Sequence, residues 1–135
     1  MFWTDLGKSA AIERAGMDGS QRVAIVGHNT TWPNGLALDY LDDRIYWVDA
    51  GTHALESCSL DGKDRKVIIR SGLQHPFGVT VFESTVYWTD WDTGSIHYAD
   101  KVTGLSQGHL DLNFGHILDL KIFHRHRTAG ELTRI

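Results

Sequence analysis

Residues 87–90 read Tyr-Trp-Thr-Asp, and the same motif occurs twice earlier in the chain. It appears as Phe-Trp-Thr-Asp at residues 2–5 and as Tyr-Trp-Val-Asp at residues 46–49. The tryptophans of the three copies are 44 and then 41 residues apart. A repeat of about this length indicates an array of similar structural units.

Two further landmarks repeat with a closely similar period. Pro-Asn-Gly at residues 33–35 returns as Pro-Phe-Gly at residues 76–78, and Asp18-Gly19 returns as Asp61-Gly62, each after 43 residues. Three independent landmarks with one period are difficult to obtain by chance. We therefore divide the chain into repeats before assigning individual elements.

One repeat contains four short strands by its pattern. The expected strands cover residues 36–40, 44–49, 54–60 and 65–70, and the last two flank the Asp61-Gly62 turn. Apolar residues alternate or form short β-branched runs, and no stretch keeps the 3.6-residue period of a helix. Four antiparallel strands in about 40–45 residues are typical of a β-propeller blade. A β-sandwich is the main alternative, but it requires no repeated aromatic motif.

The strand count predicts an all-β, partial propeller. About three blades of four antiparallel strands occupy residues 1–123, with blade boundaries near residues 34 and 77 and an extra first strand at 118–123. Residues 124–135 are expected to form an irregular tail. Closed propellers have about 4–8 blades, so one copy of this chain is not expected to close a ring.

Composition excludes several classes of protein. The 135 residues, 41% hydrophobic and 22% charged, fit one globular domain. The net charge of −4 supplies no positive field for nucleic acid. No run reaches the roughly 18 apolar residues of a membrane span, and no signal peptide is apparent. The single cysteine, Cys58, excludes an internal disulfide framework.

The repeated motif, together with residues 12–19 and 32–39, resembles the YWTD (class B repeat) β-propellers of the low-density lipoprotein receptor family. The resemblance covers residues 2 to about 127 and is greatest for receptor-related protein 4 and the Wnt co-receptors, receptor-related proteins 5 and 6. It implies a six-bladed propeller on the extracellular face of the plasma membrane, in a single-pass, membrane-anchored receptor. The chain then looks like a fragment. It departs from the pattern at Leu6, where a second Trp usually follows the motif.

The motif residues are expected to have structural roles. Aromatic pairs on a central strand fill the gaps between blades, and the Asp ends the strand with local hydrogen bonds. A ring of carboxylates for a cation is the alternative, but repetition in every blade favours a bond within the blade. No metal or cofactor is expected. The motif residues are Phe2, Trp3, Asp5, Tyr46, Trp47, Asp49, Tyr87, Trp88 and Asp90.

A candidate recognition face follows from strand direction. Because the first two strands of a blade are antiparallel, the link before the first and the turn after the second share one edge. Aromatic groups on a rigid edge are suited to recognition. The resemblance implies that this face binds extended protein segments, whereas the alternative is that Trp32 and Pro33 only order the entry into a strand. The expected residues are Trp32, Asn34, His75, Phe77, Trp91 and Leu118.

Two functional classes remain open at this point. The first is a non-catalytic module that binds extracellular protein ligands. The second is a calcium-dependent six-bladed hydrolase of the gluconolactonase or strictosidine-synthase type, in which Asn34 would be a metal ligand. Phe77 and Leu118 occupy the equivalent positions in the other blades and supply no oxygen. No enzyme is therefore expected.

Two surface features complete the expectations. Asn29-Thr30-Thr31 is an N-glycosylation sequon in a link between blades. The two end blades should expose faces that normally meet neighbours, so the chain is expected to need its missing blades or another copy to close the ring.

Overall fold

The computed structural model describes residues 1–112 and 115–124. In these ranges the chain forms strands and no helix, so no described helix could span a membrane. The strands are β1 (Phe2–Asp5), β2 (Ala11–Arg14), β3 (Val23–Val26), β4 (Pro33–Asp39), β5 (Arg44–Asp49), β6 (Ala54–Ser59), β7 (Lys66–Ile69), β8 (Pro76–Phe82), β9 (Thr85–Asp90), β10 (Ser95–Asp100) and β11 (Gly108–Asp111).

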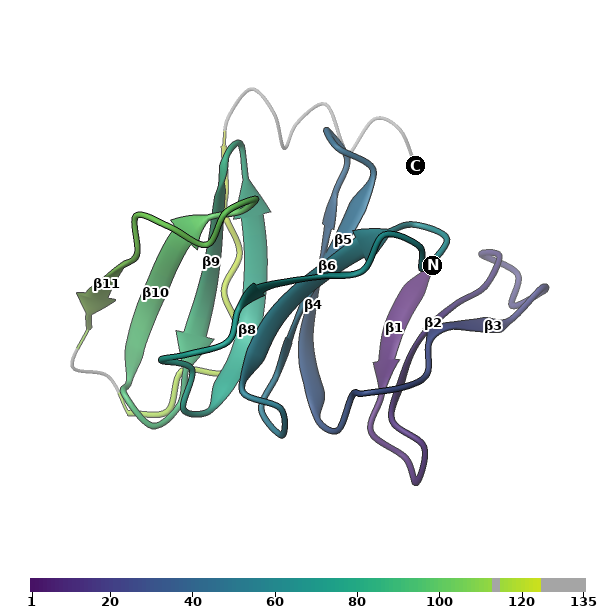
Figure 1. The fold of residues 1–135 in the computed structure, drawn as a ribbon, viewed down its shortest axis with the longest axis horizontal. Coiled ribbons are helices and arrows are strands. Elements are labelled where there is room, and N and C mark those ends of the chain that lie inside the picture. The colour runs from purple at the N-terminus through teal and green to yellow at the C-terminus, as the bar shows by residue number, and fades with distance from the viewer. Residues whose placement is uncertain (113–114, 125–135) are drawn as a thin grey trace.

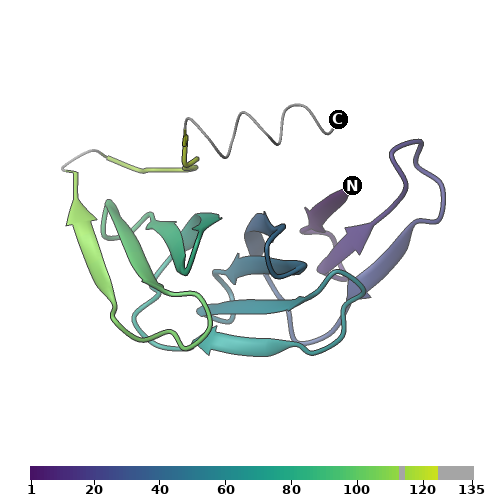
Figure 2. The same ribbon diagram turned by 90° about the horizontal axis from the view of Figure 1, so that it is seen from above.

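The strands form three antiparallel meanders, which we call blades one, two and three. Blade one is β1-β2-β3, blade two is β4-β5-β6-β7 and blade three is β8-β9-β10-β11. Figure 1 shows them side by side, and the view from above in Figure 2 shows that they follow an open arc. Blade one has three strands because the chain enters it at the motif strand, which is second in the other blades. The predicted all-β partial propeller is confirmed.

The core lies between the blades. Successive residues of a strand point to opposite faces, so Tyr46 and Trp47 fill different junctions. Trp47 packs with Ile12 and Val26 of blade one, and Tyr46 packs with Trp88 of blade three. Each aromatic side chain buries about 150–250 Å² of surface, so these residues provide the main apolar contact between blades.

Close backbone contact explains the repeated Pro-x-Gly sequence. A Cβ atom on Gly35 of β4 would overlap the Phe77 carbonyl oxygen of β8 and would lie 2.8 Å from the Val79 nitrogen. Gly78 is related to the next segment in the same way, because its Cβ would lie 2.9 Å from the Asp119 Cα. Glycine at these positions lets the first strands of adjacent blades approach each other.

A buried ion pair joins blades two and three. The Lys101 ammonium lies in the turn after β10 and donates to Asp39 and Asp42, in and after β4. Burial alone lowers the pKa of Lys101, but the two carboxylates outweigh this effect and raise the pKa. Leu60 stands 41 residues earlier, so the junction between blades one and two lacks this pair.

The structure corrects some expected element bounds. The strand expected at 36–40 begins at Pro33, and the one expected at 65–70 is limited to Lys66–Ile69. The extra first strand expected at 118–123 is absent from the described part of the chain. This segment lies beside Gly78 as a first strand would, but no described second strand follows it to form a ladder. The expected tail, apart from His124, lies outside the described residues.

Candidate ligand-binding face

Buried carboxylates join the motif strands β5 and β9 to the links that precede their blades. Asp90 accepts hydrogen bonds from the backbone N–H groups of Gln74 (2.8 Å) and His75 (3.1 Å) and from that of Asp92 (3.1 Å). The Trp91 N–H also donates to the His75 carbonyl at 2.9 Å. His75 and Trp91 are therefore held together by backbone contacts from both sides.

Asp49 does the same in blade two. Its carboxylate accepts from the N–H groups of Thr31 (2.8 Å), Trp32 (3.0 Å) and Gly51 (2.9 Å), and from the Thr30 hydroxyl (2.7 Å). Burial raises the pKa of this carboxyl, but these hydrogen bonds outweigh the burial and lower the pKa below the usual value. Such a carboxylate already has its acceptors occupied, which favours a structural role over a cation site.

An aromatic cluster gathers at this edge of blade three. The Trp91 ring makes edge contacts with His75 (centroids 5.2 Å apart), Phe77 (5.9 Å) and His116 (4.8 Å). All but His116 are half-buried, and His116 is exposed. The Trp91 indole nitrogen is buried and has no partner among the described residues. The accessible surface of this cluster therefore offers ring faces and edges, which suit apolar contact.

The remaining predicted face residues lie outside this cluster. Trp32 is 55% exposed and Leu118 is 50% exposed, and neither makes a ring contact in the described structure. Asn34 is half-buried, and its amide nitrogen donates to the Pro76 carbonyl at 3.0 Å. The Asn34 side-chain oxygen accepts no hydrogen bond from any described residue, which leaves it as the available acceptor. The structure thus joins His75, Phe77 and Trp91 directly and leaves the other three as separate positions.

The surroundings of Asn34 bear on the calcium site of the hydrolase alternative. Phe77 and Leu118 stand at the equivalent positions and present carbon side chains. No three His, Cys, Asp or Glu side chains in residues 1–112 and 115–124 lie close enough to hold a metal ion.

The motif aromatics differ in burial according to their blade. Trp47 is 0% exposed and Trp88 is 2% exposed, whereas Trp3 is only half-buried. Asp5 accepts from the Gly7 N–H at 2.8 Å, which ends β1 locally. Tyr87 lies on the face of blade three that no further blade covers in the described structure, where its ring is 6.2 Å from that of Tyr98.

Sequence reasoning did not include two sets of residues. His116 was missed, although it stands 41 residues after His75 and so has the same place in the repeat. Two Glu–Arg pairs were also missed, Glu13 with Arg22 and Glu56 with Arg65, which recur after 43 residues. In both cases the signal was the repeat period itself, applied beyond the aromatic motif.

The calcium-binding protein regucalcin from Agrobacterium tumefaciens has a similar structure. Its TM-score is 0.67 at 15% identity, over 82% of this chain and 39% of regucalcin. At this identity the similarity shows the fold alone.

Three other comparisons concern relatives of higher identity. Low-density lipoprotein receptor-related protein 5 from Homo sapiens is 41% identical over 128 residues, 92% of this chain and 8% of the relative. Vitellogenin receptor Yl from Drosophila melanogaster is 46% identical over 104 residues, 77% of this chain and 5% of the relative. A solved structure of a nidogen/laminin complex matches with TM-score 0.77 and 34% identity, over 87% of this chain and 45% of the matched one.

The family model described as low-density lipoprotein receptor repeat class B matches residues 1–40 and 43–83. These two sections contain the first two copies of the motif and the close glycine contacts of β4 and β8. The resemblance inferred from the motif is confirmed. The chain belongs to the low-density lipoprotein receptor repeat class B family.

Proposed function

We propose that this chain is part of a non-catalytic, protein-binding propeller in a low-density lipoprotein receptor-related receptor, of the Wnt co-receptor or receptor-related protein 4 type. The ligand binds at the aromatic cluster formed by His75, Phe77, Trp91 and His116. The observation that carries this proposal is the position of Trp91. Three rings surround it, and Asp90 fixes the backbone beneath it.

The relatives support a receptor that meets a protein partner outside the cell. Two of them are named as receptors or receptor-related proteins, and the solved structure is of a complex between two proteins. On this basis we place the chain on the extracellular side of a membrane-anchored receptor. The chain spans 5% and 8% of the two named relatives, so the rest of the receptor provides the anchor in this proposal.

An extended protein segment fits the chemistry of the face. Aromatic rings held by a rigid backbone cover apolar side chains without losing much rotamer entropy. The side-chain oxygen of Asn34 can accept a backbone N–H or an amide N–H from such a segment. Trp32, exposed at the entry to β4, extends the apolar surface beside Asn34, and Leu118 extends it beside the cluster.

The structure also supports N-glycosylation of Asn29 in this compartment. Asn29 is exposed and has a positive φ of 49° in the link between β3 and β4. Its carbonyl accepts from Arg65 at 2.8 Å, while Thr30 and Thr31 donate to Asp49. The backbone of the link is thus held inward, and the asparagine side chain remains in solvent.

The ligand face can be tested with linear peptides selected from a displayed library against the wild-type chain. Each selected peptide is then measured against Trp91→Ala and against Tyr40→Ala. Tyr40 is an aromatic residue of similar size that is 67% exposed in the turn between β4 and β5, at the opposite edge. Trp91→Ala is expected to weaken binding about 5- to 150-fold, the range for loss of a central aromatic contact.

The two variants separate a face effect from a general loss of aromatic surface. Tyr40→Ala is expected to leave the affinity unchanged, and circular dichroism should show the same fold for both variants. Equal affinity of Trp91→Ala and wild type for every selected peptide would assign the binding surface to another edge of the propeller.

A further inference from the structure

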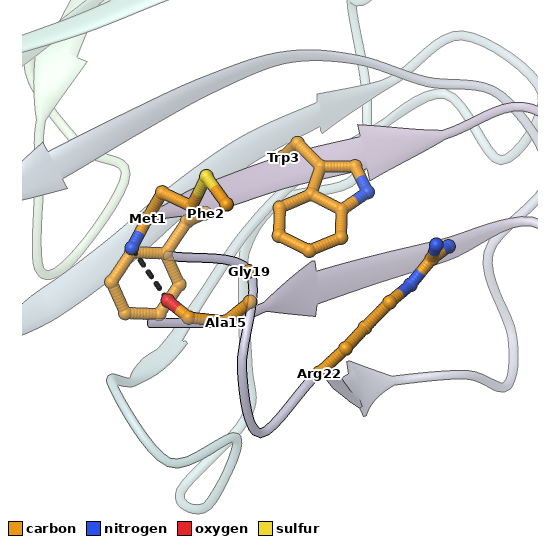
Figure 3. A pocket seen from close by; sticks show the side chains of 6 residues that line it. All are labelled: Met1, Phe2, Trp3, Ala15, Gly19 and Arg22. Carbon is orange, nitrogen blue, oxygen red and sulfur yellow. Dashed lines mark hydrogen bonds between the residues drawn. The ribbon is translucent and has the colours of Figure 1, made fainter. Parts of the chain in front are cut away.

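Blade three differs from the other two blades beside its motif tryptophan. In blades one and two an arginine lies over the tryptophan ring, 5.3 Å from the centroid, and Figure 3 shows Arg22 and Trp3 of blade one pointing toward each other. In blade three the His97 imidazole is stacked on Trp88 instead, with ring centroids 5.5 Å apart and an interplanar angle of 14°. A neutral imidazole, unlike a guanidinium, has a nitrogen lone pair that can bind a metal ion.

A second histidine stands directly opposite His97 on the neighbouring strand. His97 of β10 pairs with His109 of β11 in the antiparallel ladder, whereas the same two positions of blade two hold Glu56 and Val67. Side chains at opposed positions lie on one face of a sheet, with Cβ atoms about 4.5–5.5 Å apart. The register of the ladder therefore brings the two imidazoles together.

The distance between the two rings suits the chelation of one ion. The ring centroids of His97 and His109 are 5.7 Å apart, and the ring planes are inclined by 37°. Two imidazoles that bind one ion through nitrogen–metal bonds of about 2.0–2.1 Å have centroids about 5 Å apart. A small rotation of the exposed His109 side chain is sufficient to close this difference.

The Nε2 atoms of both rings lie toward the same end of the two strands. Nε2 of His97 is 3.0 Å from the Thr93 hydroxyl, and Nε2 of His109 is 3.6 Å from Oδ2 of Asp111. Thr93 precedes β10 and Asp111 ends the antiparallel β11, so the two contacts share one edge of the blade. Thr93 is exposed and its hydroxyl also donates to the Asp90 carbonyl at 3.4 Å, so an ion can replace the hydroxyl at His97.

The charges around the pair favour a cation. The carboxylates of Asp90 and Asp111 both act on His97 electrostatically. The Ser95 hydroxyl donates to Oδ1 of Asp111 at 2.7 Å, which leaves Oδ2 beside His109 to accept from a metal-bound water. Burial lowers the pKa of His97 below its usual value, so the imidazole is neutral near pH 7 and its lone pair is available.

We propose that His97 and His109 bind one divalent transition metal ion of the kind that prefers imidazole ligands, such as Zn²⁺ or Cu²⁺. Ca²⁺ and Mg²⁺ are disfavoured because they prefer oxygen ligands. Water completes the coordination, since residues 1–112 and 115–124 contain no group of three His, Cys, Asp or Glu side chains placed to hold an ion. The ion joins the outermost strand β11 to β10, and the site does not depend on the ligand-binding face.

Isothermal titration calorimetry of the untagged full chain with zinc chloride near pH 7 tests this site. We expect one zinc ion to bind per chain and calcium chloride to give no binding heat. His97→Gln and His109→Gln should each weaken the zinc affinity at least about 10-fold, because each removes one of two ligands. His28→Gln is the matched control, since His28 is an exposed histidine in the link between β3 and β4, and it should keep the wild-type affinity.

NMR spectra of the histidine ring nitrogens identify the ligands in the wild-type chain, without any substitution. Zinc should shift the Nε2 resonances of His97 and His109 and leave those of His28 unchanged. Lowering the pH to about 5 should release the ion, because the imidazoles must be neutral to bind it. Equal zinc affinity of the wild type and all three variants, shifts confined to other histidines, or no zinc binding would overturn the proposal.

Discussion

Blades one and two each place a Glu–Arg pair beside the motif tryptophan in the same geometry. The two tryptophans differ in burial. Arginine lies 5.3 Å from the motif tryptophan in both, yet Trp47 is fully buried and Trp3 is half-buried. The difference comes from the neighbours, because blade one covers Trp47 and no described blade covers Trp3. The motif therefore specifies geometry within a blade, whereas its contribution to the free energy of unfolding depends on the blade beside it.

The largest expected effect is loss of Trp47. Trp47→Ala removes a fully buried indole between two blades and leaves a cavity, so it should lower the free energy of unfolding by about 3–5 kcal/mol. Urea denaturation followed by circular dichroism measures this change.

Trp3→Ala is the matched control within the same repeat position. Because only one side of Trp3 is covered, Trp3→Ala should lower the free energy of unfolding by less than about 1.5 kcal/mol. Similar losses for the two variants would mean that burial by the adjacent blade does not set the contribution of the motif.

A buried ion pair between blades and an exposed pair within one turn should contribute differently to stability. Lys101→Ala leaves the buried Asp39 carboxylate without its partner and should cost about 3 kcal/mol. Lys63→Ala removes an exposed pair with Asp61, which solvent screens, and should have a much smaller effect on the free energy of unfolding. Differential scanning calorimetry of both variants compares the two losses of stability. Equal losses would show that burial adds nothing to the contribution of the Lys101 pair.

A smaller, pH-dependent effect is expected at Asp49. Its folded-state pKa lies below the ordinary value of 3.8, so its stabilisation is present above about pH 4 and is lost as the pH falls through the folded-state pKa. Asp49→Asn should cost about 1–3 kcal/mol at pH 7 and should flatten the curve of unfolding free energy against pH below pH 4.

Asp5→Asn tests the same motif position in blade one. Asp5 accepts a hydrogen bond from Gly7 and none from a preceding link in the described structure, so Asp5→Asn should lower the free energy of unfolding at pH 7 by less than Asp49→Asn does. If the unfolding free energy of Asp49→Asn fell below pH 4 as steeply as that of the wild type, the ionised Asp49 carboxylate would not be what stabilises the link.

The smallest effect on stability is expected at Asn29. The chain expressed behind an added signal peptide in eukaryotic cells should lose mass on glycosidase treatment, and Asn29→Gln should not. Since the Asn29 side chain is exposed, this substitution should change the free energy of unfolding by less than about 0.5 kcal/mol. An unchanged mass for the wild-type chain would reject glycosylation at this sequon.

The repeat period was sufficient to predict the blades, since strand bounds such as Arg44–Asp49 follow from alternation and from turn residues. It also placed His75, Phe77 and Trp91 at one edge, because antiparallel strands bring link and turn together. Both predictions depend on local pattern and on strand direction, which a sequence carries directly.

Features that depend on contacts between blades were not predicted. A strand was expected at 118–123 because a further first strand should follow the last complete blade, but a strand also requires a partner. The separation of Trp32 from the aromatic cluster, and the use of the Asn34 amide to bind Pro76, depend on how adjacent blades are inclined. Pattern within one repeat contains no information about that angle.

The glycine turns at Gly62 and Gly104 have a consequence for assembly during synthesis. Each turn lies against a backbone carbonyl of the outermost strand of the blade before it, Ile25 of β3 or Ile68 of β7, and so shields part of an edge that could otherwise pair with another chain. As the nascent chain leaves the ribosome, every new blade protects the edge of its predecessor against aggregation. The outermost strand of the most recently made blade is then the one without such shielding.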